Sequence, residues 1–205
     1  MRSIAVSVSP ATERALERTL IPLDQARELH HPGATVAAVL VPLFLADGEP
    51  QILFTRRRED MRRHAGEISF PGGRRDPDDT DTLATAIRET SEEIGLDPGS
   101  VTPLGALQPT LTIVTGYAIY PFVALIDRAA EWTPSPGEVA EVIELPLEAV
   151  RAGHARTRLV RRGIPIRTDT FTVGNNMIWG ATARILTDLF DRIPAGSLTP
   201  SQHSA

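Results

Sequence analysis

The sequence predicts an α/β protein in which a mixed sheet lies between two layers of helix. Apolar, strand-like segments occur on both sides of an amphipathic helical segment at residues 80–94, and a second amphipathic segment at residues 178–193 closes the chain. The 205 residues include 41% hydrophobic and 23% charged residues, which is ordinary for one globular domain. Strands around one central helix, covered by another helix, are typical of an α/β/α sandwich.

The composition excludes several kinds of site and partner. The chain has no cysteine, so disulfides, thiolate metal sites and cysteine nucleophiles are ruled out. Its net charge is -5, which argues against a nucleic-acid partner. The longest apolar run, residues 34–46, is too short for a membrane span and contains Pro42. The first twenty residues make a poor signal peptide, and we expect a cytoplasmic protein without membrane association.

Three regions are expected along the chain. Residues 1–30 form an N-terminal helical extension, because a loose helical stripe of leucine and alanine runs through them and is broken at Pro22. Residues 31–194 form the main domain. Residues 195–205 are small and polar, and we expect a disordered tail there.

The main domain opens with a predicted β-hairpin. Residues 34–46 are rich in valine, leucine and alanine, Asp47-Gly48 favours a tight turn, and residues 51–57 are again apolar. A basic loop and a short strand at residues 67–70 then lead to Pro71-Gly72-Gly73.

The helix predicted at residues 80–94 has clear boundaries. Thr80 or Asp81 can cap its start, and Gly95 stands where a terminating glycine belongs. Its expected core face consists of residues at helical spacing, namely Leu83, Ala86, Ile87, Thr90 and Ile94. The segments after it are predicted strands at 101–108, 118–126 and 139–145, weaker strands at 156–160 and 170–173, and the closing helix at 178–193.

The candidate catalytic and metal-binding residues lie on the helix predicted at residues 80–94. Glu89, Glu92 and Glu93 are spaced i, i+3 and i+4, so they share one face, and Arg88 can pair with Glu92 one turn away. Carboxylate oxygens are the ligands that Mg²⁺ and Mn²⁺ prefer, so these glutamates are candidate metal ligands. Taken alone, such a cluster is more often a solvated charged face.

A basic, glycine-containing segment before the helix is the candidate phosphate-binding region. Gly72 and Gly73 lack a Cβ and let the backbone approach a phosphate, although an ordinary tight turn is the alternative. Arg56, Arg63 and His64 are candidate substrate contacts in a loop that also holds Arg57, Arg58 and Arg62, because the guanidinium fork suits phosphate oxygens. A solvated basic loop is the alternative for at least half of these. Three aromatic residues can stack on a base or pack in the core: Tyr117, Tyr120 and Trp179.

Residues 73–96 resemble the Nudix box, whose pattern is G, five residues, E, seven residues, REUXEEXGU, with U aliphatic. The matching positions are Gly73, Arg88, Glu89, Glu92, Glu93, Gly95 and Leu96. The interval from Gly73 to Arg88 is one residue longer than the pattern, and Thr80 stands near the place of the leading glutamate.

A narrower resemblance, over residues 30–190, is to the coenzyme A pyrophosphatase subfamily of Nudix hydrolases. It is carried by Leu53-Phe54-Thr55-Arg56, Arg63-His64-Ala65-Gly66-Glu67 and Phe70-Pro71-Gly72-Gly73, with further similarity around 109–124, 138–147 and 178–182. Where that subfamily usually has Ser-Ala after the first arginine, this chain has Arg57-Arg58.

These resemblances imply a Nudix-type α/β/α sandwich with a catalytic loop and helix. They imply Mg²⁺ or Mn²⁺ held by Glu89, Glu92 and Glu93, with Arg88, Glu92 and Glu93 as catalytic residues. The general base is one of these glutamates or one of Glu138, Glu141 and Glu144, which the sequence does not rank.

The implied reaction is hydrolysis of the diphosphate bond of coenzyme A or acyl-CoA to 4′-phosphopantetheine, or its acyl form, and adenosine 3′,5′-bisphosphate. Two alternatives stay open. One is a Nudix hydrolase for ADP-ribose, a dinucleotide or a nucleoside triphosphate, and the other is a non-catalytic nucleotide-binding domain. A small-molecule diphosphate is the expected partner, and a homodimer is left open.

Overall fold

The computed structural model describes residues 8–60, 66–112, 116–161 and 164–198. Its main sheet is mixed and contains eight strands, in the order β3-β2-β1-β7-β5 with β4, β6 and β8 added at the sides. Their bounds are β1 (Thr35–Ala46), β2 (Glu49–Arg57), β3 (Ile68–Ser69), β4 (Gly72–Arg74), β5 (Val101–Ala106), β6 (Thr110–Leu111), β7 (Tyr117–Ile126) and β8 (Val139–Pro146). β1 and β7 are parallel, and the other pairs are antiparallel.

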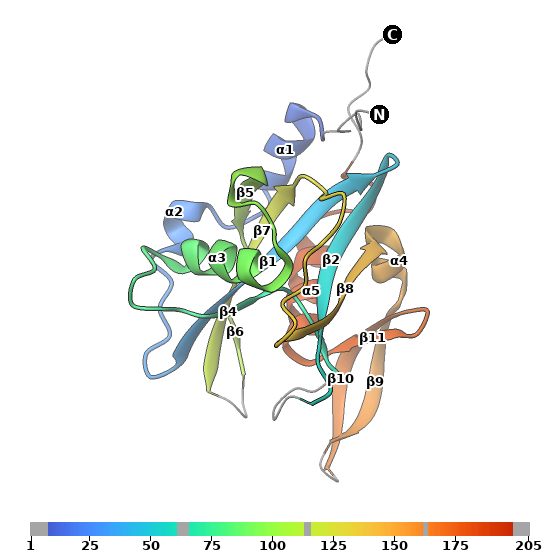
Figure 1. Cartoon of the computed structure of the whole chain (residues 1–205). Helices are drawn as coiled ribbons and strands as arrows, with labels where there is room; N and C mark the ends of the chain where they lie inside the picture. The colour runs from blue at the N-terminus through green and yellow to red at the C-terminus, as the bar shows by residue number, and fades with distance from the viewer. Residues whose placement is uncertain (1–7, 61–65, 113–115, 162–163, 199–205) are drawn as a thin grey trace.

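Two helices cover the opposite faces of this sheet (Figure 1). The helix α3 (Thr82–Ile94) packs against β1 and β4, and the helix α5 (Gly180–Arg192) packs on the other side. Successive β1 residues point to different layers, since Leu40 belongs to the core under α3 and Val41 to the core under α5. The predicted α/β/α sandwich with a mixed sheet is therefore confirmed.

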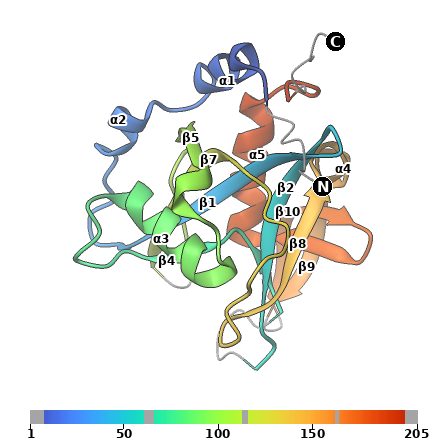
Figure 2. The ribbon, with the colours of Figure 1, turned by 45° about the horizontal axis from the view of Figure 1, so that its top comes forward.

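A second, antiparallel sheet packs beside α5 in the order β11-β10-β9. Its strands are β9 (His154–Arg161), β10 (Ile164–Val173) and β11 (Asn176–Trp179). The strand β11 also contacts β3, which places this sheet next to the end of β2. Figure 2 shows this second sheet on the side of the molecule opposite the first two helices.

The predicted hairpin and central helix lie where the sequence places them. Asp47 and Gly48 form the two-residue connection between β1 and β2, and both have positive φ, of 51° and 81°. In α3, Ala86, Thr90 and Ile94 are fully buried, as the periodicity predicts.

Several boundaries differ from the predictions. The closing helix begins at Gly180 rather than at residue 178, because Ile178 pairs with Phe171 in the sheet and is buried there. The N-terminal extension contains two short helices, α1 (Pro10–Glu17) and α2 (Leu23–Ala26), instead of one. The helix α4 (Leu147–Ala152) and the 3₁₀ turn Pro98–Ser100 were not predicted, since neither is long enough to show a period.

The extension and the start of the expected tail are packed onto the domain. Leu16 and Leu20 are buried in the core under α5, and Ile21 forms a β-bridge with Ala106. Leu198, within the expected tail, is also buried in that core. Residues 199–205 lie outside the described residues. Within the described chain, no helix is both long and apolar enough to cross a membrane.

Candidate active site

Both ends of the helix α3 are fixed, which sets the direction in which its glutamates point. Asp81 caps the start, where its Oδ1 accepts a hydrogen bond from the Ala84 N–H at 2.8 Å. Gly95 ends the helix with φ of 72°, and its N–H donates to the Ser91 carbonyl. With the apolar face on β1, the face that carries Glu89 and Glu93 is turned toward β4.

The two glycines of β4 contact these carboxylates in different ways. The Gly72 N–H donates to Oε2 of Glu93 at 3.1 Å, and Glu93 is only 5% exposed. A Cβ added to Gly73 would overlap with the carboxylate of Glu89. The space left by the missing side chain is thus filled by a protein carboxylate, where we had expected the backbone to meet a phosphate directly.

Burial and like charge make this cluster electrostatically unfavourable. The pKa of Glu93 is raised to about 7, chiefly by burial and also by Glu138 and Glu89, while the Gly72 N–H and Arg57 act in the opposite direction. Burial also raises the pKa of Glu89, with Arg88 opposing it and Glu92 and Glu138 adding to it. Carboxylates held together against repulsion are what a bound cation would stabilise.

A loop at residues 133–138 brings Glu138 to this cluster. The N–H groups of Thr133 and Ser135 donate to the carbonyls of Ile94 and Glu93, at 3.0 and 2.8 Å. The Arg58 N–H donates to the Glu138 carbonyl at 3.1 Å. The other two candidate bases are engaged elsewhere: Glu141 binds Arg56, and Glu144 accepts from Trp132 and Arg128. Of these three candidate bases, Glu138 is therefore the one whose charge acts on Glu89 and Glu93.

Arg88 is the centre of an ion-pair network that joins the loop before α3 to the acidic face. It contacts both carboxylate oxygens of Asp79, at 2.9 and 3.0 Å, and reaches Glu89 at 3.0 Å and Glu92 at 3.1 Å. Asp79 also accepts from the Asp76 N–H and the Thr85 hydroxyl, both at 2.9 Å. The bidentate contact with Arg88 holds the pKa of Asp79 well below its usual range. Arg88 thus orients the carboxylates, and the expected pair with Glu92 is present.

The predicted substrate-binding residues are in different situations. Arg56 donates to Glu141 at 3.0 Å and to Oδ1 of Asn176 at 2.6 Å, so it links β2 to β8 and β11. Arg63 and His64 lie outside the described residues.

Arg57 contributes more to this region than the sequence indicated. Its pairing with β8 shifts register between Arg56 and Arg57, and such a bulge re-aims the side chain. Its Nε atom is buried without a hydrogen-bond partner among the described residues, and its charge acts on Glu93. A buried guanidinium nitrogen without a partner, on a residue whose charge acts on Glu93, makes Arg57 a candidate for a functional role.

The donor set suits a hard divalent cation by its chemistry, since it consists of carboxylate oxygens on one helix face beside an exposed third carboxylate. In the described part of the chain, no three acidic or histidine side chains converge closely enough to enclose an ion. Glu92 is 61% exposed and turned to Arg88, whereas Glu89 and Glu93 face β4. A cation would therefore be held first by Glu89 and Glu93.

Comparison with known proteins identifies the family. A model of the NUDIX domain matches residues 34–163, which is more than half of the chain. The chain belongs to the Nudix family. This Nudix chain is 38% identical over 159 residues to a protein named "Uncharacterized Nudix hydrolase NudL" from Yersinia pestis, covering 77% of this chain and 79% of the relative. A protein of the same name from Yersinia pseudotuberculosis matches to the same extent.

The fold agrees with a solved Nudix structure. A MutT/nudix family protein from Enterococcus faecalis superposes with a TM-score of 0.54 at 15% identity, over 91% of this chain and 75% of that chain. Membership of the Nudix hydrolases assigns this chain to cleavage of the diphosphate bond in a nucleoside diphosphate derivative.

Replacing Asp79 by Asn should lower the free energy of unfolding by about 1–3 kcal/mol at pH 7, because Arg88 would lose its bidentate carboxylate partner. Urea denaturation measures this change. The matched control is Asp78→Asn, on the exposed neighbouring residue, which should change stability by less than about 0.5 kcal/mol. Equal effects of the two substitutions would show that the Arg88 network does not stabilise the loop.

Glu93→Gln should stabilise the metal-free protein at high pH. The pKa of Glu93 is about 7 when folded and 4.5 ordinarily, so between these values the folded protein binds more protons than the unfolded chain. Wild-type stability therefore falls as the pH rises through this window. At pH 8 the variant should be the more stable protein, by up to about 3 kcal/mol, and the difference should vanish near pH 4.5.

Thermal denaturation in EDTA at several pH values measures this difference. The exposed Glu131→Gln provides the control and should give a pH-independent, near-zero difference. A Glu93→Gln variant less stable than wild type at pH 8 would contradict the assignment of a destabilising buried charge.

Proposed function

We propose that this Nudix protein hydrolyses the diphosphate bond of coenzyme A or acyl-CoA in a reaction that depends on Mg²⁺ or Mn²⁺. The products are 4′-phosphopantetheine, or its acyl form, and adenosine 3′,5′-bisphosphate. The observation that carries the proposal is the buried carboxylate of Glu93 and the partly buried carboxylate of Glu89, held against Gly72 and Gly73.

The residues have distinct parts in the proposed reaction. Glu89 and Glu93 hold the cation, which, when bound, neutralises phosphate charge and makes a water easier to deprotonate. Arg88 orients Glu89 and Glu92 through its network with Asp79. Glu138, which faces the same cluster, is the group that we assign to accept the proton of the attacking water. The diphosphate lies between this cluster and Arg57.

Coenzyme A as the substrate rests on the resemblance of residues 53–73 to the pyrophosphatase subfamily. One departure favours the alternative of ADP-ribose, a dinucleotide or a nucleoside triphosphate: Arg57-Arg58 replaces the usual Ser-Ala. A non-catalytic role is disfavoured because all three glutamates of the motif are retained.

A panel of diphosphates with and without Mg²⁺ or Mn²⁺ tests the function. We expect cleavage of coenzyme A at its diphosphate, loss of activity in EDTA, and a loss of at least about a hundredfold in kcat for Glu89→Gln and Glu93→Gln. Cleavage of another diphosphate without cleavage of coenzyme A would reject the substrate. Full activity of Glu93→Gln would reject the metal site, and circular dichroism establishes that the variants are folded.

Arg57→Ala should lower kcat/KM by about ten- to a hundredfold, because a charge-assisted hydrogen bond to the diphosphate is worth about 1.5–3 kcal/mol. The control is Arg58→Ala, since Arg58 is occupied by Asp60 and by the Pro136 carbonyl. Steady-state kinetics of both variants measure the difference. Equal losses would show that Arg57 does not contact the substrate.

A further inference from the structure

A cavity of about 500 Å³ lies between the N-terminal extension and the start of α3. Its size is within the range of small-molecule sites. Nine residues from four segments line it: Arg27, Leu29, His30, Val36, Arg75, Thr80, Asp81, Thr82 and Tyr120. None of them belongs to the acidic cluster of Glu89, Glu93 and Glu138. The loop at residues 75–81 lies between the cavity and that cluster: Arg75 lines the cavity, and Asp79 binds Arg88. The cavity is thus a separate feature from the catalytic face.

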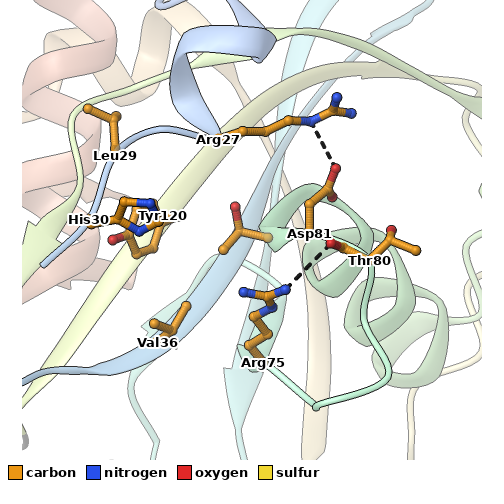
Figure 3. A pocket seen from close by; sticks show the side chains of 9 residues that line it. Arg27, Leu29, His30, Val36, Arg75, Thr80, Asp81 and Tyr120 are labelled. Carbon is orange, nitrogen blue, oxygen red and sulfur yellow. Dashed lines mark hydrogen bonds and ion pairs between the residues drawn. The ribbon is translucent and has the colours of Figure 1, made fainter. Parts of the chain in front are cut away.

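One wall of the cavity is polar and carries two arginines (Figure 3). Arg27 contacts Asp81 through Nε at 3.0 Å, and no contact of its two terminal nitrogens is seen within the described residues. Arg75 uses Nη2 to reach the carbonyls of Asp79 and Thr80, at 3.1 and 3.5 Å. Both guanidinium groups therefore keep N–H donors for a further acceptor.

The charges of the lining residues do not cancel. Two arginines face a single carboxylate, Asp81, which also caps α3 through the Ala84 N–H. The lining is thus positive by one unit in a chain whose net charge is -5. The start of the 13-residue helix α3, at Thr82, adds its dipole in the same sense. An anion is the ligand charge that this wall accommodates.

The opposite wall is apolar and aromatic. Leu29, Val36 and Tyr120 line it, and Figure 3 shows Leu29, His30 and Tyr120 on the side of the cavity away from Asp81 and Thr80. Tyr120 is only 4% exposed, and its ring lies 6.2 Å from the His31 ring between centroids. An apolar wall in the same cavity as two arginines suits a molecule with a flat ring at one end and an anionic group at the other.

We propose that this cavity is a second ligand site, which binds a small phosphorylated compound with a flat ring, of the nucleoside monophosphate class. The phosphate contacts Arg27 and Arg75, and the base packs against Tyr120 and His30. The proposal does not depend on the reaction or on the metal, because no residue of the cavity belongs to the acidic cluster.

Calorimetric titration with AMP in EDTA tests the site. Wild type should bind AMP, and Arg75→Gln and Arg27→Gln should each weaken binding by about tenfold or more, since each removes a charge-assisted phosphate contact. Arg156→Gln, on the exposed surface of β9, is the matched control and should bind like wild type. Because Arg27 also holds Asp81, its variant is checked for an unchanged fold by circular dichroism, and Arg75→Gln provides an independent result.

Two further measurements distinguish binding in the cavity from binding at the catalytic face. Glu93→Gln should leave the affinity for AMP unchanged if the nucleotide occupies the cavity, and inorganic phosphate should bind more weakly than AMP if the aromatic wall contributes. No binding at millimolar AMP, wild-type affinity in both cavity variants, or equal affinity for phosphate and AMP would each overturn the proposal. AMP binding in EDTA is measured without hydrolysis, so failure of this site is distinct from failure of the proposed function.

Discussion

The contact between the buried carboxylate of Glu93 and the backbone of Gly72 is the constraint on which the site depends. A buried carboxylate with a raised pKa is costly, and the fold retains it because α3 is pressed onto β4 by the apolar residues on its other side. Gly73 allows Glu89 to lie in the same narrow space. A side chain at Gly73 would overlap with Glu89 on the helix, and one at Gly72 would overlap with the β1 backbone at Ala38 and Val39. Both positions therefore require glycine, and the two glycines and two glutamates act as one unit.

Several charged residues around this unit act on its two carboxylates. Arg88 partly neutralises Glu89 and is itself fixed by Asp79, while Arg57 faces Glu93 from the end of β2. The loop at 133–138 adds a further negative charge, from Glu138, where repulsion is already present. Repulsion among these carboxylates lowers the stability of the fold, and it favours the binding of a cation between them.

Local patterns predicted the helix, because its cap, its period and its terminating glycine all lie within fifteen residues. They also predicted the hairpin, since the Asp47-Gly48 turn is a local signal. They could not show that Gly72 donates to Glu93, a contact across 21 positions of sequence, or that the space at Gly73 holds a carboxylate. The role of Arg57 was hidden for a similar reason, because a bulge within strand pairing has no signature in a single sequence.

The two ends of α3 are held by segments that have nothing else in common. Its start is joined to the extension through Arg27 and Asp81, and its end is held by the loop that carries Glu138. Asp81 also caps α3 through the Ala84 N–H, so the extension contacts the residue that fixes the first turn of the helix. Arg27 makes this contact through Nε, and it also lines the cavity beside the helix start. The extension is therefore more than a cover for the core, since it supplies a charged contact to the residue that caps the helix of the acidic face.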